Sequence, residues 1–203
     1  EVEYMQSKER VNSAYGMCVT DILRDEITYS LDEWGKETPD IEEAISKYNK
    51  SKRRFLSYAW GVWVTAYARY NLMSCIVEFG EDYIYSDTDS VKGQNIEKHQ
   101  WYIDRYNDYM ITKLERAFDF HGIPRELIRP KNNKGEEKIL GTWEDEGIYT
   151  RFRTLGAKRY MTEKPNRLGE LEISITVSGV NKKKAVPYLK EKYGDKVFEN
   201  FDN

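Results

Sequence analysis

One stretch decides the fold of this chain, Asp82-Tyr83-Ile84-Tyr85-Ser86-Asp87-Thr88-Asp89-Ser90-Val91-Lys92-Gly93. Its first half is typical of a strand and Ser90 begins a second strand-like run, so the pattern predicts a β-hairpin with Asp87 and Asp89 at its turn. Two carboxylates held at one turn supply the hard oxygen ligands that Mg²⁺ prefers. A pair of solvated turn residues gives the same pattern, and the hairpin alone leaves both interpretations open.

The composition is that of a folded protein. Of the 203 residues, 39% are hydrophobic and 33% charged, which excludes a disordered chain, and no apolar run reaches the ~18–20 residues of a membrane span. Cys18 and Cys75 match no metal-ligand spacing, which favours a reducing compartment. His99 and His121 are expected to be surface or packing residues. We expect a soluble, cytoplasmic protein without a secretory leader, cut from a longer chain.

The charges are unevenly distributed, although the formal net charge is only −3. Residues 1–50 hold six Lys and Arg against twelve Asp and Glu, a balance of −6. Residues 151–192 hold eleven Lys and Arg against four Asp and Glu, a balance of +7, with aromatic residues between them. Such a segment favours a phosphate backbone as partner, because Lys and Arg displace its condensed counterions. A solvated basic face is the alternative.

A helical pattern runs from Met5 to Thr20. Within it Lys8, Asn12 and Tyr15 are four and then three residues apart, so they share one helix face and can meet one ligand together. A cation, an amide and an aromatic ring on one face suit a triphosphate, a sugar edge and a base or ribose plane. The alternative places Tyr15 in a core and Lys8 in solvent.

Two contrasting segments follow. Residues 21–54 are polar and have the character of an insertion, with a helix predicted from Asp40 to Asn49 and Thr38 or Asp40 as its cap. Phe55 to Phe79 is the most apolar segment, and its near-helical period predicts one long buried helix.

Three residues of that apolar helix suit a phosphate backbone. Thr65 and Arg69 lie one turn apart with Ala68 beside them. A small residue between a hydroxyl and a guanidinium lets a phosphate approach closely and be held by directed donors. A salt bridge from Arg69 to Glu78 or Asp82 is the alternative.

The second half of the chain predicts a mixture of strands and helices. Residues 96–120 form an amphipathic helix whose core stripe is Ile103, Tyr106, Met110, Leu114 and Ala117. Residues 139–144, 148–153 and 171–177 have the pattern of short strands, and a helix begins near Lys182 and is unfinished at Asn203. If Lys158 and Tyr160 lie in a strand, they point to the same side and can meet a nucleic-acid strand together.

Taken in order, these features resemble the motifs of family B DNA polymerases. The matching motifs are Lys8-x-x-x-Asn12-Ser13-x-Tyr15-Gly16, Thr65-x-x-Ala68-Arg69, Tyr85-x-Asp87-Thr88-Asp89-Ser90 and Lys158-x-Tyr160. Thr-x-x-Ala-Arg ahead of the hairpin and Leu140-Gly141-x-Trp143 ahead of Lys-x-Tyr are typical of the protein-primed phage branch. The resemblance covers nearly the whole chain, while the chain covers only the carboxyl-terminal part of such an enzyme.

The resemblance implies an α+β fold. An antiparallel palm sheet would carry the hairpin, backed by helices 55–79 and 96–120. The parts would be the second half of the fingers (1–18), an insertion at the second terminal-protein-region position (19–57), the palm (58–178) and the start of the thumb (179–203). In those enzymes the insertion is a hairpin, and the helical pattern of residues 40–49 departs from it.

The resemblance also implies the site. Asp89, with Asp87 assisting, would hold two Mg²⁺, for which Mn²⁺ can substitute, and the two ions would clamp the attacking and leaving oxygens of phosphoryl transfer. The dNTP would be bound by Lys8, Asn12, Tyr15 and Tyr85. Primer-template DNA would be held by Thr65, Ala68, Arg69, Lys158 and Tyr160.

Two further partners are implied, a terminal protein primer and the remainder of the polymerase chain. The remainder would supply the palm aspartate that is not found before Lys8, so the fragment by itself is expected to be inactive. A D-x-D metal-dependent glycosyltransferase would explain the paired acids but not the motifs around Lys8 and Lys158. A nucleic-acid-binding module without catalysis would explain the basic segment but not the paired acids, and a degenerate polymerase fragment that only binds DNA is the alternative function. A DNA-directed DNA polymerase accounts for both features.

Overall fold

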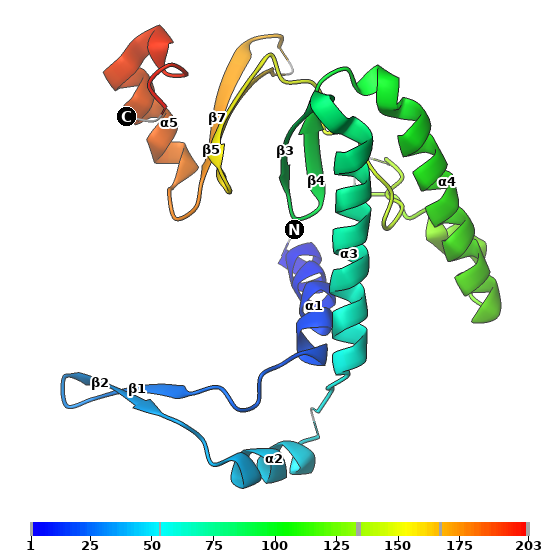
Figure 1. Ribbon diagram of the computed structural model, residues 1–203, viewed down its shortest axis with the longest axis vertical. Helices are drawn as coiled ribbons and strands as arrows, with labels where there is room; N and C mark the ends of the chain where they lie inside the picture. Colours follow the sequence, from blue (N-terminus) through cyan, green and yellow to red (C-terminus); the bar gives the residue numbers. More distant parts are fainter. Residues whose placement is uncertain (1, 53, 133–134, 167, 202–203) are drawn as a thin grey trace. The chain divides into compact units, whose positions relative to one another are not determined.

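A computed structural model describes residues 2–52, 54–132, 135–166 and 168–201, and for Tyr4, Lys8, Val11 and Asn12 it describes the backbone alone. The chain divides into two compact units, Glu1–Met73 and Ser74–Asn203 (Figure 1). Within the described ranges, seven strands form three small antiparallel sheets between helices, so the fold is mixed α+β. No helix in these ranges is long and apolar enough to cross a membrane.

The first unit contains two helices, a hairpin and the start of a third helix. These are α1 (Val2–Cys18), β1 (Glu26–Ser30), β2 (Glu33–Glu37), α2 (Ile41–Lys50) and α3 (Tyr58–Phe79), which continues into the second unit. The predicted helix at residues 40–49 is confirmed as α2, whose N-cap Asp40 accepts a hydrogen bond from the Glu43 backbone N–H at 2.8 Å.

The residue pattern itself did not predict the β1–β2 hairpin, although the resemblance places a hairpin in this insertion. Its turn residues Leu31 and Asp32 both have positive φ, 54° and 64°. A two-residue hairpin turn usually has Gly or Asn in this left-handed region, so the leucine at position 31 does not indicate such a turn. The polar stretch before α2 therefore contains a strand pair as well as the expected helix.

The α1 and α3 helices approach closely where α1 ends. A Cβ atom on Gly61 would lie 2.0 Å from Cγ1 of Val19, and the Ser57 backbone N–H donates to the Cys18 carbonyl at 3.1 Å. Only a glycine permits this approach. In the described part of the first unit, Cys18 and Gly61 are the only buried residues, so this unit has little core of its own.

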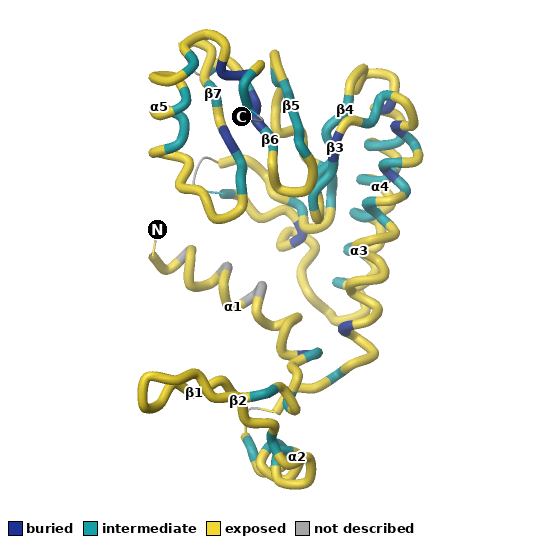
Figure 2. Tube along the Cα trace, turned by 60° about the vertical axis from the view of Figure 1, so that its left-hand side comes forward, coloured by how far each residue is buried: buried dark blue, intermediate teal, exposed yellow. Residues whose placement is uncertain are grey.

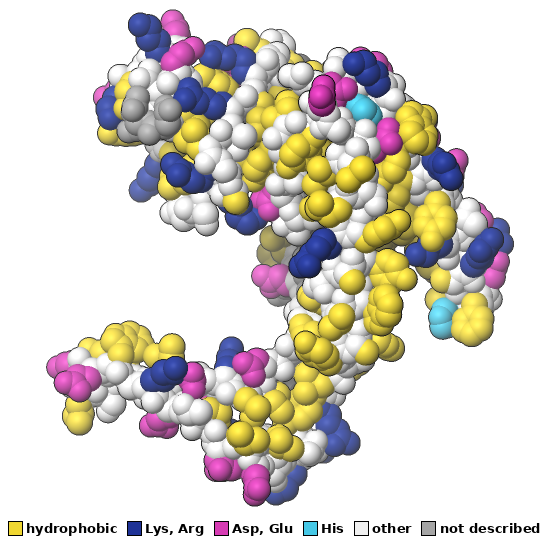
Figure 3. All heavy atoms as spheres, in the orientation of Figure 1, with side chains coloured by type: hydrophobic (Ala, Val, Ile, Leu, Met, Phe, Trp, Pro, Cys, Tyr) yellow, Lys and Arg dark blue, Asp and Glu magenta, His cyan; other side chains and the backbone are white. Residues whose placement is uncertain are grey.

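The prediction that α3 is a buried helix is wrong. Its side chains are largely exposed, and the exposed fractions are 63% for Trp60, 68% for Tyr70 and 75% for Val77. Figure 3 shows hydrophobic side chains gathered over this helix. The helix is apolar on all sides, whereas the described elements cover only the face that carries Gly61, Cys75 and Phe79. The apolar run predicted a helix correctly but could not say what covers it.

The second unit holds the predicted hairpin and a three-stranded sheet. The hairpin is β3 (Tyr83–Asp87) with β4 (Ser90–Gly93), and the sheet has the order β5 (Arg151–Gly156), β6 (Arg159–Pro165), β7 (Leu171–Val177). The helices are α4 (Ile96–Phe120), α5 (Lys182–Tyr193) and the short 3-10 segments η1 (Gly80–Asp82), η2 (Arg125–Ile128) and η3 (Gly194–Lys196).

Several sequence predictions for this unit are confirmed and others are wrong. The hairpin, α4 and β7 have the predicted positions. Residues 139–144 form no strand, the strand expected at 148–153 begins only at Arg151, and the last helix ends at Tyr193, where Gly194 has φ 55°. The expected single sheet is also absent in the described ranges, because the hairpin contacts the β5–β7 sheet through side chains and not through a backbone ladder.

The core of the second unit lies between the β5–β7 sheet and α5. Met161, Ile175, Val197 and Phe198 are 0–4% exposed, and Leu189 and Tyr193 of α5 pack against them. The Arg153 guanidinium donates to the Phe198 carbonyl and ties β5 to the segment after α5. Figure 2 shows buried stretches of chain in β6 and β7.

A second, smaller packing centre joins α3 to α4. The His99 ring is stacked on Phe79 with centroids 4.4 Å apart, and its nitrogens lie 3.4 Å from Glu78 Oε1 and 3.1 Å from Asp82 Oδ2. The predicted core stripe of α4 is only partly buried, and Ala117 is exposed. An irregular loop covers the stripe, since Asn107 pairs with both backbone groups of Trp143. The α4 helix is therefore covered by loop and not by sheet.

Candidate functional site

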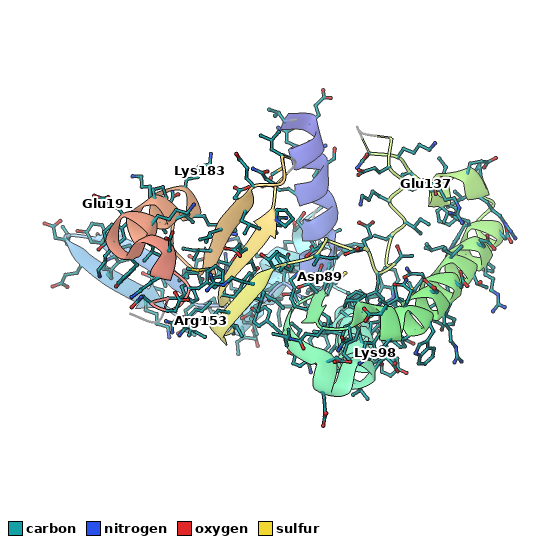
Figure 4. The ribbon with its side chains drawn as sticks, turned by 90° about the horizontal axis from the view of Figure 1, so that it is seen from above. Asp89, Lys98, Glu137, Arg153, Lys183 and Glu191 are labelled. Carbon is teal, nitrogen blue, oxygen red and sulfur yellow. The ribbon has the colours of Figure 1, made fainter. Side chains whose placement is uncertain are left out.

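The tip of the β3–β4 hairpin presents two carboxylates, as the sequence predicts. Asp87 ends β3, Thr88 and Asp89 form the loop, and Ser90 begins β4. Thr88 has a positive φ of 55°, the Asp89 backbone N–H donates to the Asp87 carbonyl at 2.6 Å, and the Ser90 hydroxyl donates to the same carbonyl at 3.2 Å. This tight turn holds both acids at one end of the hairpin, where Figure 4 labels Asp89.

The Lys158 side chain lies against Asp87. Its Nζ donates to both carboxylate oxygens at 2.7 Å, across 71 residues of sequence. Lys158 is in the turn between β5 and β6 with φ 56°, so the prediction that it shares a strand face with Tyr160 is wrong. The turn nevertheless brings the ammonium to the hairpin tip. Lys158 and Asp87, two residues that the sequence placed in separate motifs, thus belong to one site.

An aromatic cluster supports this contact. The Tyr85 ring is 7% exposed and lies 5.1 Å from the Tyr160 ring and 5.8 Å from the Phe152 ring, centroid to centroid. The Tyr85 hydroxyl accepts a hydrogen bond of 3.0 Å from the Lys158 backbone N–H. Tyr85, expected to border a nucleotide, therefore fixes the β5–β6 turn against β3. Phe152 joins this cluster, and its only sequence signal was its place among the aromatics of the basic segment.

Charge compensation shifts the pKa values of both partners. Hydrogen bonds from Lys158 and, second, from Thr88 lower the pKa of Asp87, and the Asp87 carboxylate raises the pKa of Lys158. Each shift favours the charged form of its group. The pair is therefore ionised near neutral pH. The Asp87 side chain remains 27% exposed and that of Lys158 56% exposed.

Asp89 differs from Asp87 in its surroundings. It is exposed, and in the described part of the chain its carboxylate makes no hydrogen bond or ion pair. One carboxylate of the tip is thus neutralised by an ammonium, and the other is exposed and has no partner among the described residues.

The donor set fits part of a metal site. Among the described residues, no three His, Cys, Asp or Glu side chains gather closely enough to hold a metal ion. Mg²⁺ is commonly bound by one or two carboxylates together with substrate phosphates and water, so Asp87 and Asp89 suit it in number and kind. The Asp87 carboxylate already has a cationic partner, because the Lys158 ammonium donates a hydrogen bond to each of its two oxygens. The tip can therefore contribute two carboxylates to a cation, and further ligands must come from elsewhere.

A second lysine holds the base of the hairpin. Lys92 Nζ of β4 lies 2.5 Å from Glu146 Oε2 and 5.5 Å from the centroid of the Tyr149 ring, and its side chain is only 12% exposed. Desolvation opposes the charge of Lys92, but hydrogen bonds and charges of Glu146 and Tyr149 outweigh it and raise the pKa of the ammonium. Lys92 was not singled out by the sequence, and its role here is structural.

The remaining predicted site residues, which are Lys8, Asn12, Tyr15, Thr65, Ala68 and Arg69, belong to the first unit. The side chains of Lys8 and Asn12 lie outside the described part of the chain. Tyr15 on α1 is 36% exposed. Thr65 donates within α3 to the carbonyls of Gly61 and Val62 at 3.0 and 2.9 Å, and Ala68 beside it is exposed.

Arg69 is exposed on α3 and makes no ion pair among the described residues. The alternative salt bridge from Arg69 to Glu78 or Asp82 is not found among the described residues, and His99 contacts both of these carboxylates. The arginine is therefore left to solvent or to a ligand.

Comparisons with protein-family models, curated proteins and solved structures found no match to this chain. What the site can do thus depends on its own chemistry. A pair of carboxylates can hold a divalent cation, a flexible ammonium beside them can meet a phosphate, and the aromatic cluster fixes their spacing. This combination suits a reaction of a phosphorylated substrate.

Proposed function

We propose that this chain is part of a DNA-directed DNA polymerase of family B, in the protein-primed phage branch. Such an enzyme adds a dNMP to the 3′-hydroxyl of a primer under direction of a template. The observation that carries the proposal is the meeting of two motifs, because Lys158 and Tyr160 contact Asp87 and Tyr85 of the hairpin across about seventy residues. The resemblance predicts both motifs at one polymerase site, and their contact supports it.

In this proposal the hairpin carboxylates hold the cations. Asp89 is the principal ligand and Asp87 the second. Two bound Mg²⁺, or Mn²⁺, would make the primer hydroxyl a better nucleophile and neutralise the triphosphate. Lys158 and Tyr160 hold the primer end, and the Tyr85 ring fixes the turn that carries them. The dNTP is met by Lys8, Asn12 and Tyr15 of α1.

The elements of the fold fit the proposed parts. The insertion expected at residues 19–57 contains the β1–β2 hairpin, and a hairpin is what the resemblance predicts there. The β3–β4 hairpin and the β5–β7 sheet would belong to the palm, α1 to the fingers and α5 to the start of the thumb. The proposed palm would thus consist of two small antiparallel sheets, which are in side-chain contact.

The proposed partners follow from charge and exposure. Primer-template DNA would lie against the basic segment of residues 151–192 and against Thr65, Ala68 and Arg69 on α3. A terminal protein primer and the remainder of the polymerase chain, which would supply the third carboxylate, are the other partners. The enzyme would act in the host cytoplasm during replication of a phage genome.

Primer extension tests the proposal. This chain is combined with the upstream piece that carries the missing palm aspartate, and a primed template is incubated with dNTPs and Mg²⁺. Extension is expected only when both pieces are present. Asp89→Asn should abolish it and should remove metal-dependent dNTP binding, whereas Asp195→Asn, the same change at an exposed acid of η3, should do neither. Folded pieces that bind dNTP and metal equally well with Asn at position 89 would overturn the proposal.

A degenerate polymerase fragment that only binds DNA is the second candidate. The Lys158–Asp87 ion pair favours it, because this contact neutralises one of the two acids without any metal. In that case Asp89→Asn leaves the affinity for primed DNA unchanged, and neither protein extends a primer with the upstream piece.

A further inference from the structure

The ion pair of Lys158 and Asp87 occupies oxygens that a divalent cation would also use. The ammonium contacts Oδ1 and Oδ2 of Asp87 at the same distance, 2.7 Å. An ammonium and a divalent cation compete for the same lone pairs of a carboxylate and repel each other at close range. The Lys158 contact and a divalent cation at Asp87 therefore oppose each other.

The backbone of Lys158 is anchored by Tyr85, whereas its side chain is largely exposed and contacts Asp87 through the ammonium. The backbone N–H of Lys158 donates to the hydroxyl of Tyr85, whose ring is enclosed by Phe152 and Tyr160. The Lys158 side chain is 56% exposed, and its four-carbon stem allows many rotamers. A rotation of the side chain alone can thus release Asp87 without moving the β5–β6 turn.

The other acid of the tip offers a place where a cation can begin to bind. Asp89 is exposed, and its carboxylate has no partner among the described residues. Asp89 belongs to the two-residue loop that directly follows Asp87 at the end of β3, so a cation at Asp89 binds at the same hairpin tip as Asp87. The positive charge of this cation repels the Lys158 ammonium and weakens its ion pair with Asp87. The released ammonium can then pair with another anion.

We propose that Lys158 is an exchangeable counter-ion of Asp87. The ammonium holds the carboxylate when no divalent cation is bound, and it moves to a phosphate oxygen of the substrate when a cation binds at Asp87 and Asp89. This inference rests on the proposed function, since it uses the same cation and the same phosphorylated substrate. Lys158 remains charged throughout, no covalent bond changes, and the residue acts as a positioning residue that couples cation binding to phosphate binding.

Binding of MnCl₂ to the full chain, measured by electron paramagnetic resonance of free Mn²⁺, tests the exchange. Lys158→Met removes the competing ammonium and should tighten Mn²⁺ binding by about fivefold or more. The matched control Lys196→Met removes an exposed lysine of η3, outside the basic segment of residues 151–192, and should leave the Mn²⁺ affinity unchanged. In an Asp87→Asn background, Lys158→Met should no longer tighten binding, because the shared carboxylate is gone.

Labelling of the unaltered protein provides a second readout. The rate at which an amine-reactive reagent acetylates Lys158, followed by mass spectrometry, should rise when MnCl₂ is added, since the ammonium leaves its carboxylate. The rate at Lys183 should stay the same. This measurement needs no variant and is independent of whether Lys158→Met folds.

The outcomes separate the exchange from the proposed function. If Asp89→Asn abolishes Mn²⁺ binding but Lys158→Met does not tighten it and MnCl₂ does not change Lys158 labelling, the exchange is wrong and the metal site stands. If neither the wild type nor Lys158→Met binds Mn²⁺ when it is combined with the upstream piece, both the exchange and the metal role of the hairpin are wrong.

Discussion

At the residue scale, the second unit separates side chains that hold the fold from side chains left for a ligand. Tyr85 and His99 are buried and have both packing and hydrogen-bond partners. Asp89 is exposed without a partner in the described chain, and Lys158 is half exposed with a partner it can release. Chemistry is therefore expected at the hairpin tip, and stability is expected to depend on the residues behind it.

Met161 is the most deeply buried of these supporting residues, with no exposed surface. Met161→Ala should lower the free energy of unfolding by about 2–5 kcal/mol, because it removes transfer energy and leaves a cavity between Ile175 and Phe198. Urea denaturation measures the decrease. Leu168→Ala makes a similar deletion at a side chain that is 84% exposed and should change stability by less than about 0.5 kcal/mol. Equal decreases in the two variants would contradict the placement of the core.

Asp82 should make the stability of the second unit depend on pH in acid. A hydrogen bond from Asn95, and then one with His99, lowers the pKa of Asp82 in the folded protein. The folded state thus holds the charged form more tightly than the unfolded chain does. The resulting stabilisation is complete above the ordinary Asp pKa of about 3.9 and is lost as the pH falls through the lowered folded value.

Urea midpoints of wild type and Asp82→Asn measure this effect. Their difference should shrink as the pH falls below about 4. Asp108→Asn, at an exposed position of α4, should show no such trend. A difference between wild type and Asp82→Asn that grows in acid would mean that the carboxylate is not stabilised by its partners.

At the element scale, the β3–β4 hairpin packs closely against the end of α3, because Gly93 has no side chain at the point of contact. A Cβ atom on Gly93 would lie 2.4 Å from Cδ1 of Phe79 and 2.9 Å from the Asp82 carbonyl oxygen. The Phe79 ring cannot easily give way, because it is stacked on His99. The position of the carboxylates therefore depends on a close contact at the opposite end of the hairpin.

Gly93→Ala should accordingly destabilise the second unit by about 1–3 kcal/mol through overpacking. Thermal unfolding compared with that of Gly16→Ala tests this, since nothing lies within 4 Å of a Cβ at Gly16 on α1. The control should be neutral or slightly stabilising, because alanine favours a helix more than glycine does. A Gly93→Ala protein as stable as wild type would show that Phe79 moves freely.

At the scale of the whole molecule, burial and charge are both distributed unevenly. In the described ranges the first unit buries only Cys18 and Gly61, whereas the second unit has the core around Met161. The basic residues 151–192 belong to the second unit and the acidic residues 1–50 to the first. Local stability and affinity for polyanions should therefore differ between the units.

Hydrogen exchange followed by mass spectrometry checks the difference in stability. Backbone amides of β6 and β7 should exchange slowly, because their ladder covers the core, and amides of β1 and β2 should exchange fast, because every residue of that hairpin is exposed. If the amides of β1 and β2 exchanged as slowly as those of β6 and β7, another element would have to cover the first hairpin.

The charge distribution predicts the salt dependence of DNA binding, if the proposed function holds. Replacing Lys182, Lys183 and Lys184 with Gln should reduce the slope of log affinity against log salt by up to about 0.9 for each phosphate that the protein no longer neutralises. The same change at Lys36, Lys47 and Lys50, in the acidic part, should leave the slope unaltered. Fluorescence anisotropy with primed DNA at several salt concentrations measures both. Equal slopes in all three proteins would exclude α5 from the DNA interface.

The sequence by itself determined the local elements and the chemistry of the tip. Turn residues between two strand-like runs were enough to predict the hairpin with Asp87 and Asp89, and hydrophobic period and caps were enough for α2 and α4, because these signals act over a few residues. They failed for the β1–β2 turn, where Leu31 and Asp32 adopt a conformation that their side chains do not favour.

The tertiary structure decided which elements meet and which faces stay open. That α3 is exposed, that Lys158 lies in a turn and reaches Asp87, and that Tyr85 anchors this turn all depend on contacts between segments far apart in sequence. Local propensity carries no information about such contacts, since the same apolar or charged pattern is compatible with several partners. An ion pair between two motifs appears only when the folded chain places their atoms 2.7 Å apart.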